Sequence, residues 1–193
     1  MIILIGGVSC TGKTNMSQKL LEKYHIPYLS IDHIKMGLIR GNRYCDFKAT
    51  DRDEEIAEKI WPIIKGIIKT NIENDQHLII EGCYIPTTYK DDFEPEYLKH
   101  IILLYLGFSK HYIDSQFKSS ILTYKSIIEY KEMDEDYMNI DNFIKLHYEQ
   151  AQLCGKNHMN YFEICESYED EIIKIYEWID EKTKAIRNLK FNI

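Results

Sequence analysis

The stretch Gly7-Val8-Ser9-Cys10-Thr11-Gly12-Lys13-Thr14 decides the fold of this chain. It has the pattern G-x-x-x-x-G-K-[ST] without deviation, and it directly follows the aliphatic run Ile2–Ile5. A short continuous run of this kind is typical of a strand that is buried on both faces, and we expect a helix from Asn15 to Tyr24. A strand, a glycine-rich turn and a helix in this order predict a loop whose backbone holds phosphate groups.

The chemistry of phosphate binding explains the fixed positions of the pattern. Glycine lets the backbone curl so that successive N–H groups converge on phosphate oxygens, and the helix N-terminus adds partial positive charge. We expect Lys13 to reach the β- and γ-phosphates of a nucleotide and the Thr14 hydroxyl to ligate Mg²⁺. The expected nucleotide-binding residues are Gly7, Val8, Ser9, Cys10, Thr11, Gly12, Lys13, Thr14 and Asn15. Cys10 is expected to be open to alkylation, which would block the loop.

Strand-like and helix-like patterns alternate along the rest of the chain. Four more short apolar runs resemble the first, at Tyr28–Ile31, Leu78–Ile80, Ile101–Leu106 and Tyr161–Ile164. Longer stretches between them carry apolar residues at helical spacing. Five buried-type strands alternating with helices predict an α/β fold with a parallel sheet flanked by helices. No repeat or linker interrupts the pattern, so we expect residues 1–193 to form a single domain.

Several helices carry start or stop signals. A Thr50-x-x-Asp53 box precedes an apolar stripe from Ile56 to Ile72, and Pro62 is expected to kink or divide that helix. Ser109 is expected to start a further helix, and a Ser167-x-x-Asp170 box the last one. The same region, Glu166–Asp170, is our positional expectation for the adenine of a nucleotide.

Composition and charge exclude several classes of protein. The 193 residues include 24 Lys and Arg against 31 Asp and Glu, a net charge of −7, which does not suit a nucleic-acid partner. No apolar run approaches the roughly 20 residues of a membrane span, and the first residues lack the pattern of a signal peptide. The cysteines are scattered and odd in number, without a C-x-x-C pair: Cys10, Cys45, Cys83, Cys154 and Cys165. This usage is typical of a reduced, cytoplasmic protein.

Acidic side chains follow two of the expected strands. Asp32 follows the second strand, where it can accept the proton of an acceptor hydroxyl or hold Mg²⁺ through water. An N-cap on the next helix is the alternative role for Asp32. Glu81 ends the third strand as the acid of a Walker B segment does, beside the metal or the attacking hydroxyl. The expected metal ligands are therefore Thr14, Asp32 and Glu81.

Basic residues soon after Asp32 favour an anionic acceptor. Lys35, Arg40 and Arg43 form a basic cluster in an acidic protein, and Arg40 is the first candidate because its planar fork suits bidentate binding. A solvated surface charge is the open alternative for each of the three. Gly82, which permits close approach of a ligand to the backbone, and Tyr84 complete the expected substrate-binding residues.

Residues 1–40 and 77–86 resemble the small P-loop kinase group, which includes nucleoside monophosphate, shikimate and gluconate kinases. The segments G-G-V-S-C-T-G-K-T, S-I-D-H and L-I-I-E-G-C-Y-I-P are most similar to bacterial adenylate-kinase-like or 2-phosphoglycerate-kinase-like proteins. The resemblance implies a P-loop NTPase fold with a five-stranded parallel sheet of order 2-3-1-4-5 and a helical lid, here residues 108–157. It also implies phosphate and Mg²⁺ roles for Lys13 and Thr14 and an acceptor-side role for Asp32.

The sequence departs from adenylate kinases in two places. They carry D-G-F-P-R after the third strand, where this chain has E-G-C-Y-I-P without an arginine. Their lid is rich in arginine, whereas the segment between Gly107 and Asn157 of this chain contains lysines and no arginine. Lys118 and Lys125, seven residues apart and so on one helical face, are the candidates for neutralising transition-state charge. A solvated helix face is the alternative for both.

These observations predict a catalytic core made of Lys13, Asp32, Glu81 and Arg40. The predicted activity is a cytoplasmic kinase that transfers the γ-phosphoryl group of ATP, with Mg²⁺, to a small anionic metabolite. We expect no nucleic-acid or membrane partner. Three alternatives stay open: a nucleoside monophosphate kinase, a nucleotide-sugar kinase of the zeta-toxin kind, and a non-catalytic ATP-binding switch or simple ATPase.

Overall fold

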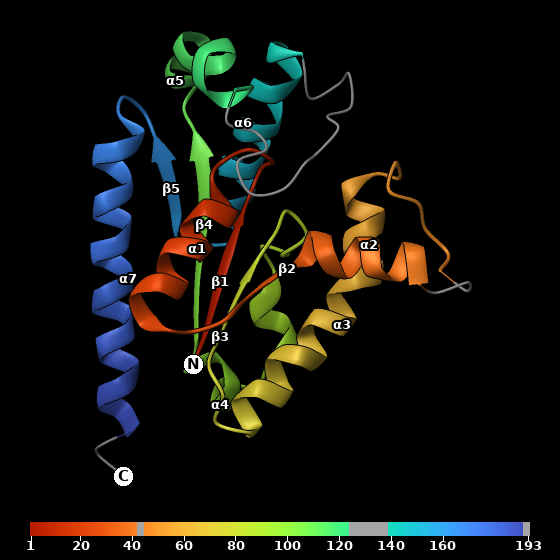
Figure 1. Cartoon of the computed structure of the whole chain (residues 1–193), viewed down its shortest axis with the longest axis vertical. Coiled ribbons are helices and arrows are strands. Elements are labelled where there is room, and N and C mark those ends of the chain that lie inside the picture. Colours follow the sequence, from red (N-terminus) through yellow and green to blue (C-terminus); the bar gives the residue numbers. More distant parts are fainter. Residues whose placement is uncertain (42–44, 124–138, 191–193) are drawn as a thin grey trace. The chain divides into compact units, whose positions relative to one another are not determined.

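A computed structural model describes residues 1–41, 45–123 and 139–190 of the chain, with side chains through residue 186 (Figure 1). Its strands are β1 (Ile2–Gly7), β2 (Tyr28–Ser30), β3 (Leu78–Glu81), β4 (Ile101–Phe108) and β5 (Tyr161–Ile164). They form one sheet of order β2-β3-β1-β4-β5. The pairs β1–β3, β2–β3 and β4–β5 are parallel. The predicted α/β fold and the sheet order that the resemblance implied are both confirmed.

Helices follow the strands in the alternation that the sequence predicted. They are α1 (Lys13–Tyr24), α2 (Ile31–Gly41), α3 (Asp53–Glu73), α4 (Pro95–Leu98), α5 (Lys110–Gln116), α6 (Ile140–Lys156) and α7 (Tyr168–Lys190). A 3-10 helix, η1 (Tyr89–Asp92), precedes α4, and a π-helical turn, η2 (Phe117–Ile121), continues α5.

The chain divides into two compact units. The first comprises Met1–Gly6 and Met16–Leu103, and the second comprises Gly7–Asn15 and Leu104–Ile193. The boundaries fall within β1, α1 and β4. Each unit is described by itself below.

The first unit contains β2, β3 and most of β1. Ile2–Ile5 are fully buried, as expected for a strand with neighbours on both sides. β2 is only partly buried because it lies at the edge of the sheet. Its last residue is Ser30, so the expected strand Tyr28–Ile31 is one residue too long. Ile31 instead begins α2 and is fully buried there.

We expected Pro62 to kink or divide helix α3, and the helix runs unbroken through this proline, so the division does not occur. Proline removes one backbone hydrogen bond, but the buried stripe on both sides of it holds the helix together. That stripe includes Ile56, Ile60, Ile64 and Ile68. The Thr50-x-x-Asp53 box is also wrong as a cap, because Arg52 is the N-cap residue and has no side-chain capping bond. Acidic residues in the first turn favour this end of the helix instead.

The second unit contains most of β4 together with β5, α5, α6 and α7. In Figure 1, α7 runs beside β5, which it contacts, and α6 also contacts β5. The Ser109 side chain accepts a hydrogen bond from the Tyr112 N–H at 3.1 Å, which confirms the predicted cap of α5. Ser167 caps α7 as predicted, with its hydroxyl 3.3 Å from the Asp170 N–H. Of the expected lid, residues 124–138 lie outside the described residues.

Candidate functional site

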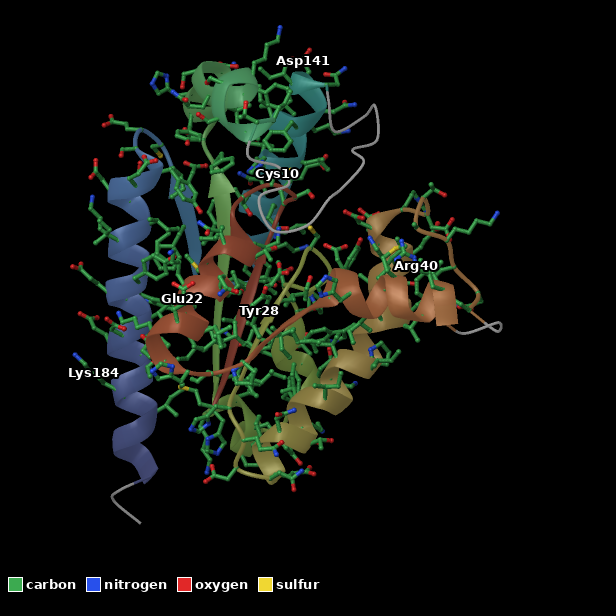
Figure 2. All side chains as sticks on the ribbon, in the orientation of Figure 1. Cys10, Glu22, Tyr28, Arg40, Asp141 and Lys184 are labelled. Atoms are coloured by element: carbon green, nitrogen blue, oxygen red, sulfur yellow. The ribbon has the colours of Figure 1, made fainter. Side chains whose placement is uncertain are left out.

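The segment Gly7–Asn15, here called the phosphate loop, lies between β1 and the body of α1 (Figure 2, where Cys10 is labelled). Three of its residues have positive φ angles: 132° at Gly7, 66° at Cys10 and 84° at Gly12. Such angles bend the chain sharply and are adopted most readily by glycine. Cys10 adopts a left-handed conformation that is unfavourable for a residue with a side chain. The backbone of the loop is thus shaped as the sequence pattern predicted.

Both glycines of the phosphate loop are required by close contacts within the second unit. A Cβ atom at Gly7 would lie 2.2 Å from the backbone oxygen of Leu106, and one at Gly12 would lie 2.0 Å from the Tyr168 hydroxyl. Tyr168 and Leu106 therefore form part of the wall of the loop. The loop pattern itself names neither residue, because each comes from a distant part of the chain, although Tyr168 lies in the segment Glu166–Asp170 where the adenine was expected.

Lys13 begins α1 and is 6% exposed. Its ammonium group donates a hydrogen bond to the Val8 carbonyl at 2.7 Å, and the Thr11 hydroxyl donates to the same oxygen at 2.9 Å. The lysine is thus folded back over its own loop, where it supplies a positive charge in a nearly dry environment. Such a charge is strongly attracted to an anion that enters the loop. Thr14 follows in the first turn of the helix and is partly exposed.

In the first unit, Asp32, Lys35 and Tyr84 come together, and this group is called the Lys35 cluster below. The ammonium group of Lys35 lies 2.9 Å from the Asp32 carboxylate and donates a hydrogen bond of 2.7 Å to the Tyr84 hydroxyl. It also lies 5.1 Å from the centre of the Tyr84 ring, in a cation–π contact. Lys35 is only 6% exposed, so the surface-charge alternative is wrong for this residue.

Asp32 and Lys35 meet because they are three residues apart on α2, in neighbouring turns of one face. Asp32 lies inside the first turn of α2 rather than before it, so the N-cap alternative for this residue is wrong. Tyr84 was predicted as a substrate-binding residue and lies within the same cluster.

Glu81 is the last residue of β3 and is buried. In the strand register it lies opposite Ile5 of β1 and Ser30 of β2. The phosphate loop begins two residues after Ile5 along the chain. A carboxylate is therefore present at the carboxyl end of the strand next to the one that leads into the loop, as predicted.

Gly82 has a packing role that the sequence did not reveal. Its N–H group donates to the Ile5 carbonyl at 3.1 Å, and a Cβ atom here would lie 2.8 Å from Cβ of Ile31. Because Gly82 has no side chain, Ile31 of α2 can pack closely against it.

The other basic candidates are spread over the chain. Arg40 is exposed in the last turn of α2 (Figure 2), and Lys118 is exposed in the π-helical turn η2. Arg43 and Lys125 lie outside the described residues. Neither Arg40 nor Lys118 is part of the Lys35 cluster.

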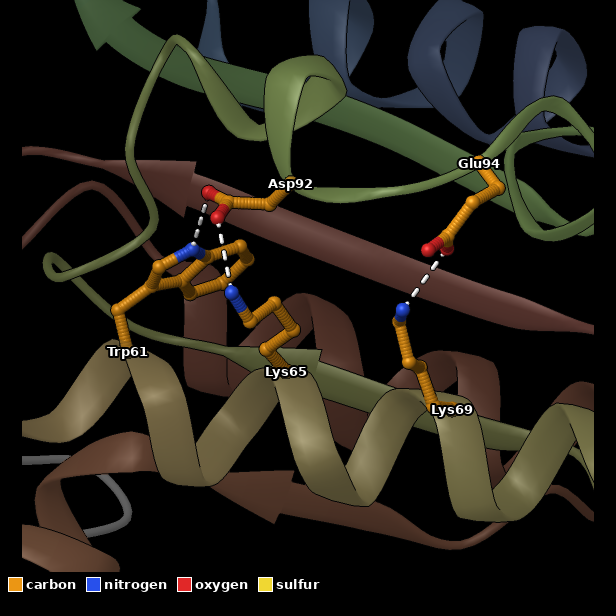
Figure 3. Close-up of polar contacts among 5 residues, drawn as sticks. All are labelled: Trp61, Lys65, Lys69, Asp92 and Glu94. Atoms are coloured by element: carbon orange, nitrogen blue, oxygen red, sulfur yellow. Dashed lines mark hydrogen bonds and ion pairs between the residues drawn. The ribbon is translucent and has the colours of Figure 1, made fainter.

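The segment after Tyr84 is fastened to α3 by side chains one helical turn apart (Figure 3). Asp92 accepts hydrogen bonds from the Trp61 ring N–H at 2.8 Å and from Lys65 at 3.0 Å, and Lys69 donates to Glu94 at 2.8 Å. Partial burial opposes ionisation of Asp92, but these donors prevail, so its pKa lies below the ordinary value. This stretch is therefore held in place by α3.

Within the described ranges 1–41, 45–123 and 139–190, no three His, Cys, Asp or Glu side chains gather as a group that could hold a metal ion. In the same part of the chain, no helix has the length and apolar character needed to cross a membrane.

A parallel sheet of order 2-3-1-4-5 with a glycine-rich phosphate loop after its central strand defines the P-loop NTPase class. Within this class, the chain has the fold of the small P-loop kinases, in agreement with the resemblance seen in the sequence.

Solved structures of this group cover nearly the whole chain. A gluconokinase from Sinorhizobium meliloti has a TM-score of 0.53 and 14% identity over 98% of this chain and 95% of its own. A deoxyadenosine kinase from M. mycoides has a TM-score of 0.52 and 12% identity over 94% and 100%. A shikimate kinase from Bacteroides thetaiotaomicron has a TM-score of 0.50 and 14% identity over 93% and 98%. The sequence matches no family model and no curated protein.

Proposed function

We propose that this protein is a small-molecule kinase that transfers the γ-phosphoryl group of ATP to an anionic metabolite carrying a hydroxyl group. The observation that carries the proposal is the buried Lys13 ammonium group, held over a loop with left-handed turns at the start of a helix. This arrangement suits a polyphosphate because the backbone N–H groups, the helix dipole and the lysine all favour negative charge at one place.

The phosphate loop takes the nucleotide in this proposal. Its N–H groups and Lys13 bind the phosphate oxygens and stabilise the charge that spreads over them during transfer. Mg²⁺ prefers oxygen ligands and keeps several waters and phosphate oxygens around it. The Thr14 hydroxyl and the strand-end carboxylate Glu81 are oxygen donors of this kind, and Asp32 is the third. Such an ion would neutralise charge on the β- and γ-phosphates of the nucleotide.

The acceptor is assigned to the Lys35 cluster. Asp32 is the hydrogen-bond acceptor for the hydroxyl that is phosphorylated, and the ammonium group of Lys35 lies 2.9 Å from this carboxylate. An ammonium group has three N–H donors, and two of them are directed to Asp32 and Tyr84. The third is suited to an oxygen of the acceptor, and a carboxylate or phosphate there gains most from the positive charge.

The names of two of the three similar structures support the same class of acceptor. Gluconokinase and shikimate kinase are named for hydroxy acids, whereas deoxyadenosine kinase is named for an uncharged nucleoside. A buried lysine at the acceptor side favours the hydroxy acids. Arg40, which is exposed, stays a candidate for holding the anionic end of the acceptor, and so does Arg43, which lies outside the described residues.

The test is release of ADP from Mg-ATP across a panel of acceptors. The panel contains sugar acids, other hydroxy acids, phosphoglycerates, nucleosides, nucleoside monophosphates and UDP-sugars. We expect stimulation by one anionic class and a decrease of about 100-fold or more with Lys13→Ala, because the lysine stabilises transition-state charge. Lys19→Ala is the matched control, since Lys19 is an exposed lysine of the same helix that pairs with Glu22 at 3.5 Å.

Two outcomes would redirect the proposal. If only nucleosides or nucleotides stimulate ADP release, the acceptor is a nucleoside or a nucleotide and not a hydroxy acid. Lys13-dependent ATP binding with no stimulation by any acceptor, and with no effect of Asp32→Asn on turnover, would favour the switch or simple ATPase alternative.

A further inference from the structure

A buried histidine lies in the same unit as the phosphate loop and has no part in the function proposed above. His147 is on α6 and is 2% exposed. Its ring is stacked on Phe108 with 5.3 Å between centroids, and Phe143 packs against it at 4.6 Å. Two aromatic side chains thus fix the plane of the imidazole.

The hydrogen bonding of His147 determines where its proton lies. The backbone N–H of Phe108 donates to Nδ1 of His147 at 2.9 Å. A nitrogen that accepts a hydrogen bond carries no proton in the neutral ring, so the proton of a neutral imidazole is on Nε2. This Nε2 atom is buried and has no hydrogen-bond partner among the described residues. A buried donor without a partner is unfavourable and is rare in folded proteins.

The phosphate loop lies close enough to act on this ring. Burial, and after it the positive charge of Lys13, lower the pKa of His147 to about 3, so the ring is neutral at physiological pH. Phe108 also contacts the Tyr168 ring at 6.4 Å between centroids, and the Tyr168 hydroxyl packs on Gly12 of the loop. The imidazole therefore belongs to an aromatic wall that continues to the loop.

We propose that His147 is a ligand-contacting residue whose Nε2–H donates a hydrogen bond to a phosphate oxygen of the nucleotide held by the phosphate loop. The inference rests on the nucleotide binding in the proposed function. A neutral imidazole adds a directed donor without a second buried cation beside Lys13. The orphaned Nε2–H group then gains its missing partner when the nucleotide binds.

Two substitutions separate this role from a purely structural one. The Asn oxygen in His147→Asn is placed to accept from the Phe108 N–H as Nδ1 does, but the variant lacks the Nε2–H donor. His147→Gln can supply an N–H near the position of Nε2, but it loses the acceptor for Phe108. We expect His147→Asn to bind Mg-ATP about 10- to 100-fold more weakly, as for loss of a hydrogen bond to a charged group, and His147→Gln to bind more tightly than His147→Asn.

The closing experiment combines ATP titration of the three proteins with ¹⁵N NMR of the imidazole in the full chain. On saturation with Mg-ATP we expect the Nε2–H signal of the wild type to shift downfield and exchange more slowly with water. Lys13→Ala serves as the nucleotide-binding control. If the wild type binds ATP in a Lys13-dependent way and His147→Asn binds equally well, the inference is overturned while the proposed function stands.

A wild type that binds no ATP would overturn both proposals together. If His147→Asn does not fold, the NMR signal of the wild type decides the question. An Nε2–H resonance that does not move on ATP saturation overturns the inference, and one that moves supports it.

Discussion

The phosphate loop and the Lys35 cluster are built in opposite ways. The loop is a continuous segment whose shape comes from its backbone, with positive φ angles at Gly7, Cys10 and Gly12. The cluster consists of side chains from two distant segments, since Lys35 and Tyr84 are 49 positions apart. The loop therefore has a recognisable sequence pattern, whereas nothing in the sequence near Lys35 indicates that it is buried.

This difference predicts different sensitivities to substitution. Adding one carbon atom should damage the loop, because its backbone has no room for it. Removing one charge should damage the cluster, because a charged group inside the protein needs its partner.

The largest effect is expected for Gly7→Ala. The added Cβ atom would lie 2.2 Å from a backbone oxygen, at a φ angle of 132° that side chains rarely allow. We expect the free energy of unfolding to fall by about 3 kcal/mol or more, because the new Cβ atom and the Leu106 oxygen are both fixed to backbone and cannot easily move apart. Urea unfolding measures it, and Gly66→Ala is the control because nothing lies within 4 Å of that helical position. A loss below about 1 kcal/mol would contradict the tight loop, and the control should be neutral or slightly stabilising.

Lys35→Met should have the next largest effect. It removes the ion-pair partner of Asp32 at a site where both side chains are largely buried, and we expect a loss of about 3 kcal/mol in unfolding free energy. Lys69→Met is the matched control, because the pair with Glu94 is more exposed to water and is expected to contribute little to stability. The Lys35→Met/Asp32→Asn double variant should recover part of the loss. Equal effects of the two lysine substitutions would contradict a buried cluster.

The pH dependence of stability should carry a signature of His147. Its folded-state pKa of about 3 lies below the ordinary value of 6.5, so the unfolded chain binds the proton more readily. Its contribution to stability is complete above pH 6.5 and is lost as the pH falls toward 3. We expect a loss of about 1 kcal/mol between pH 6.5 and pH 5.5 that His147→Asn does not show. Parallel curves for the two proteins, measured by denaturant unfolding, would rule out a buried neutral imidazole.

The smallest effect is expected for Cys10→Gly. Glycine relieves the left-handed strain at φ 66°, but it also increases the entropy of the unfolded chain, so the net change should lie within about 0.5 kcal/mol. ATP affinity should stay unchanged, since the backbone of the loop makes the contacts. Cys10→Val, with a branched side chain at the same angle, should lose about 1–2 kcal/mol and weaken ATP binding. Titration with ATP of the two variants side by side checks this.

Much of the fold could be predicted because its signals are local. The run Ile2–Ile5 predicted β1, and Ser109 predicted the start of α5 through its hydroxyl. The errors have a physical origin as well. Pro62 does not divide α3, because burial of the stripe on both sides outweighs one lost backbone hydrogen bond.

Less of the candidate site could be predicted, because its side-chain environment is made by distant residues. Tyr168 lies in the segment Glu166–Asp170 where the adenine was expected, but nothing in the sequence indicates that Tyr168 packs on Gly12 or that His147 lies near the loop. Lys35 belongs to a run of basic residues that is typical of a protein surface, yet it is buried against Tyr84.

The sequence by itself determined the phosphate loop, the strand that leads into it and the alternation that makes the sheet parallel. These features depend on backbone conformation and on the period of apolar residues, which neighbouring positions control. Only the tertiary structure decided that Lys35 is buried against Tyr84, that Gly12 packs on Tyr168 and that His147 has an unused donor. Burial and side-chain pairing depend on residues brought together from far along the chain, and no local pattern records which residues those are.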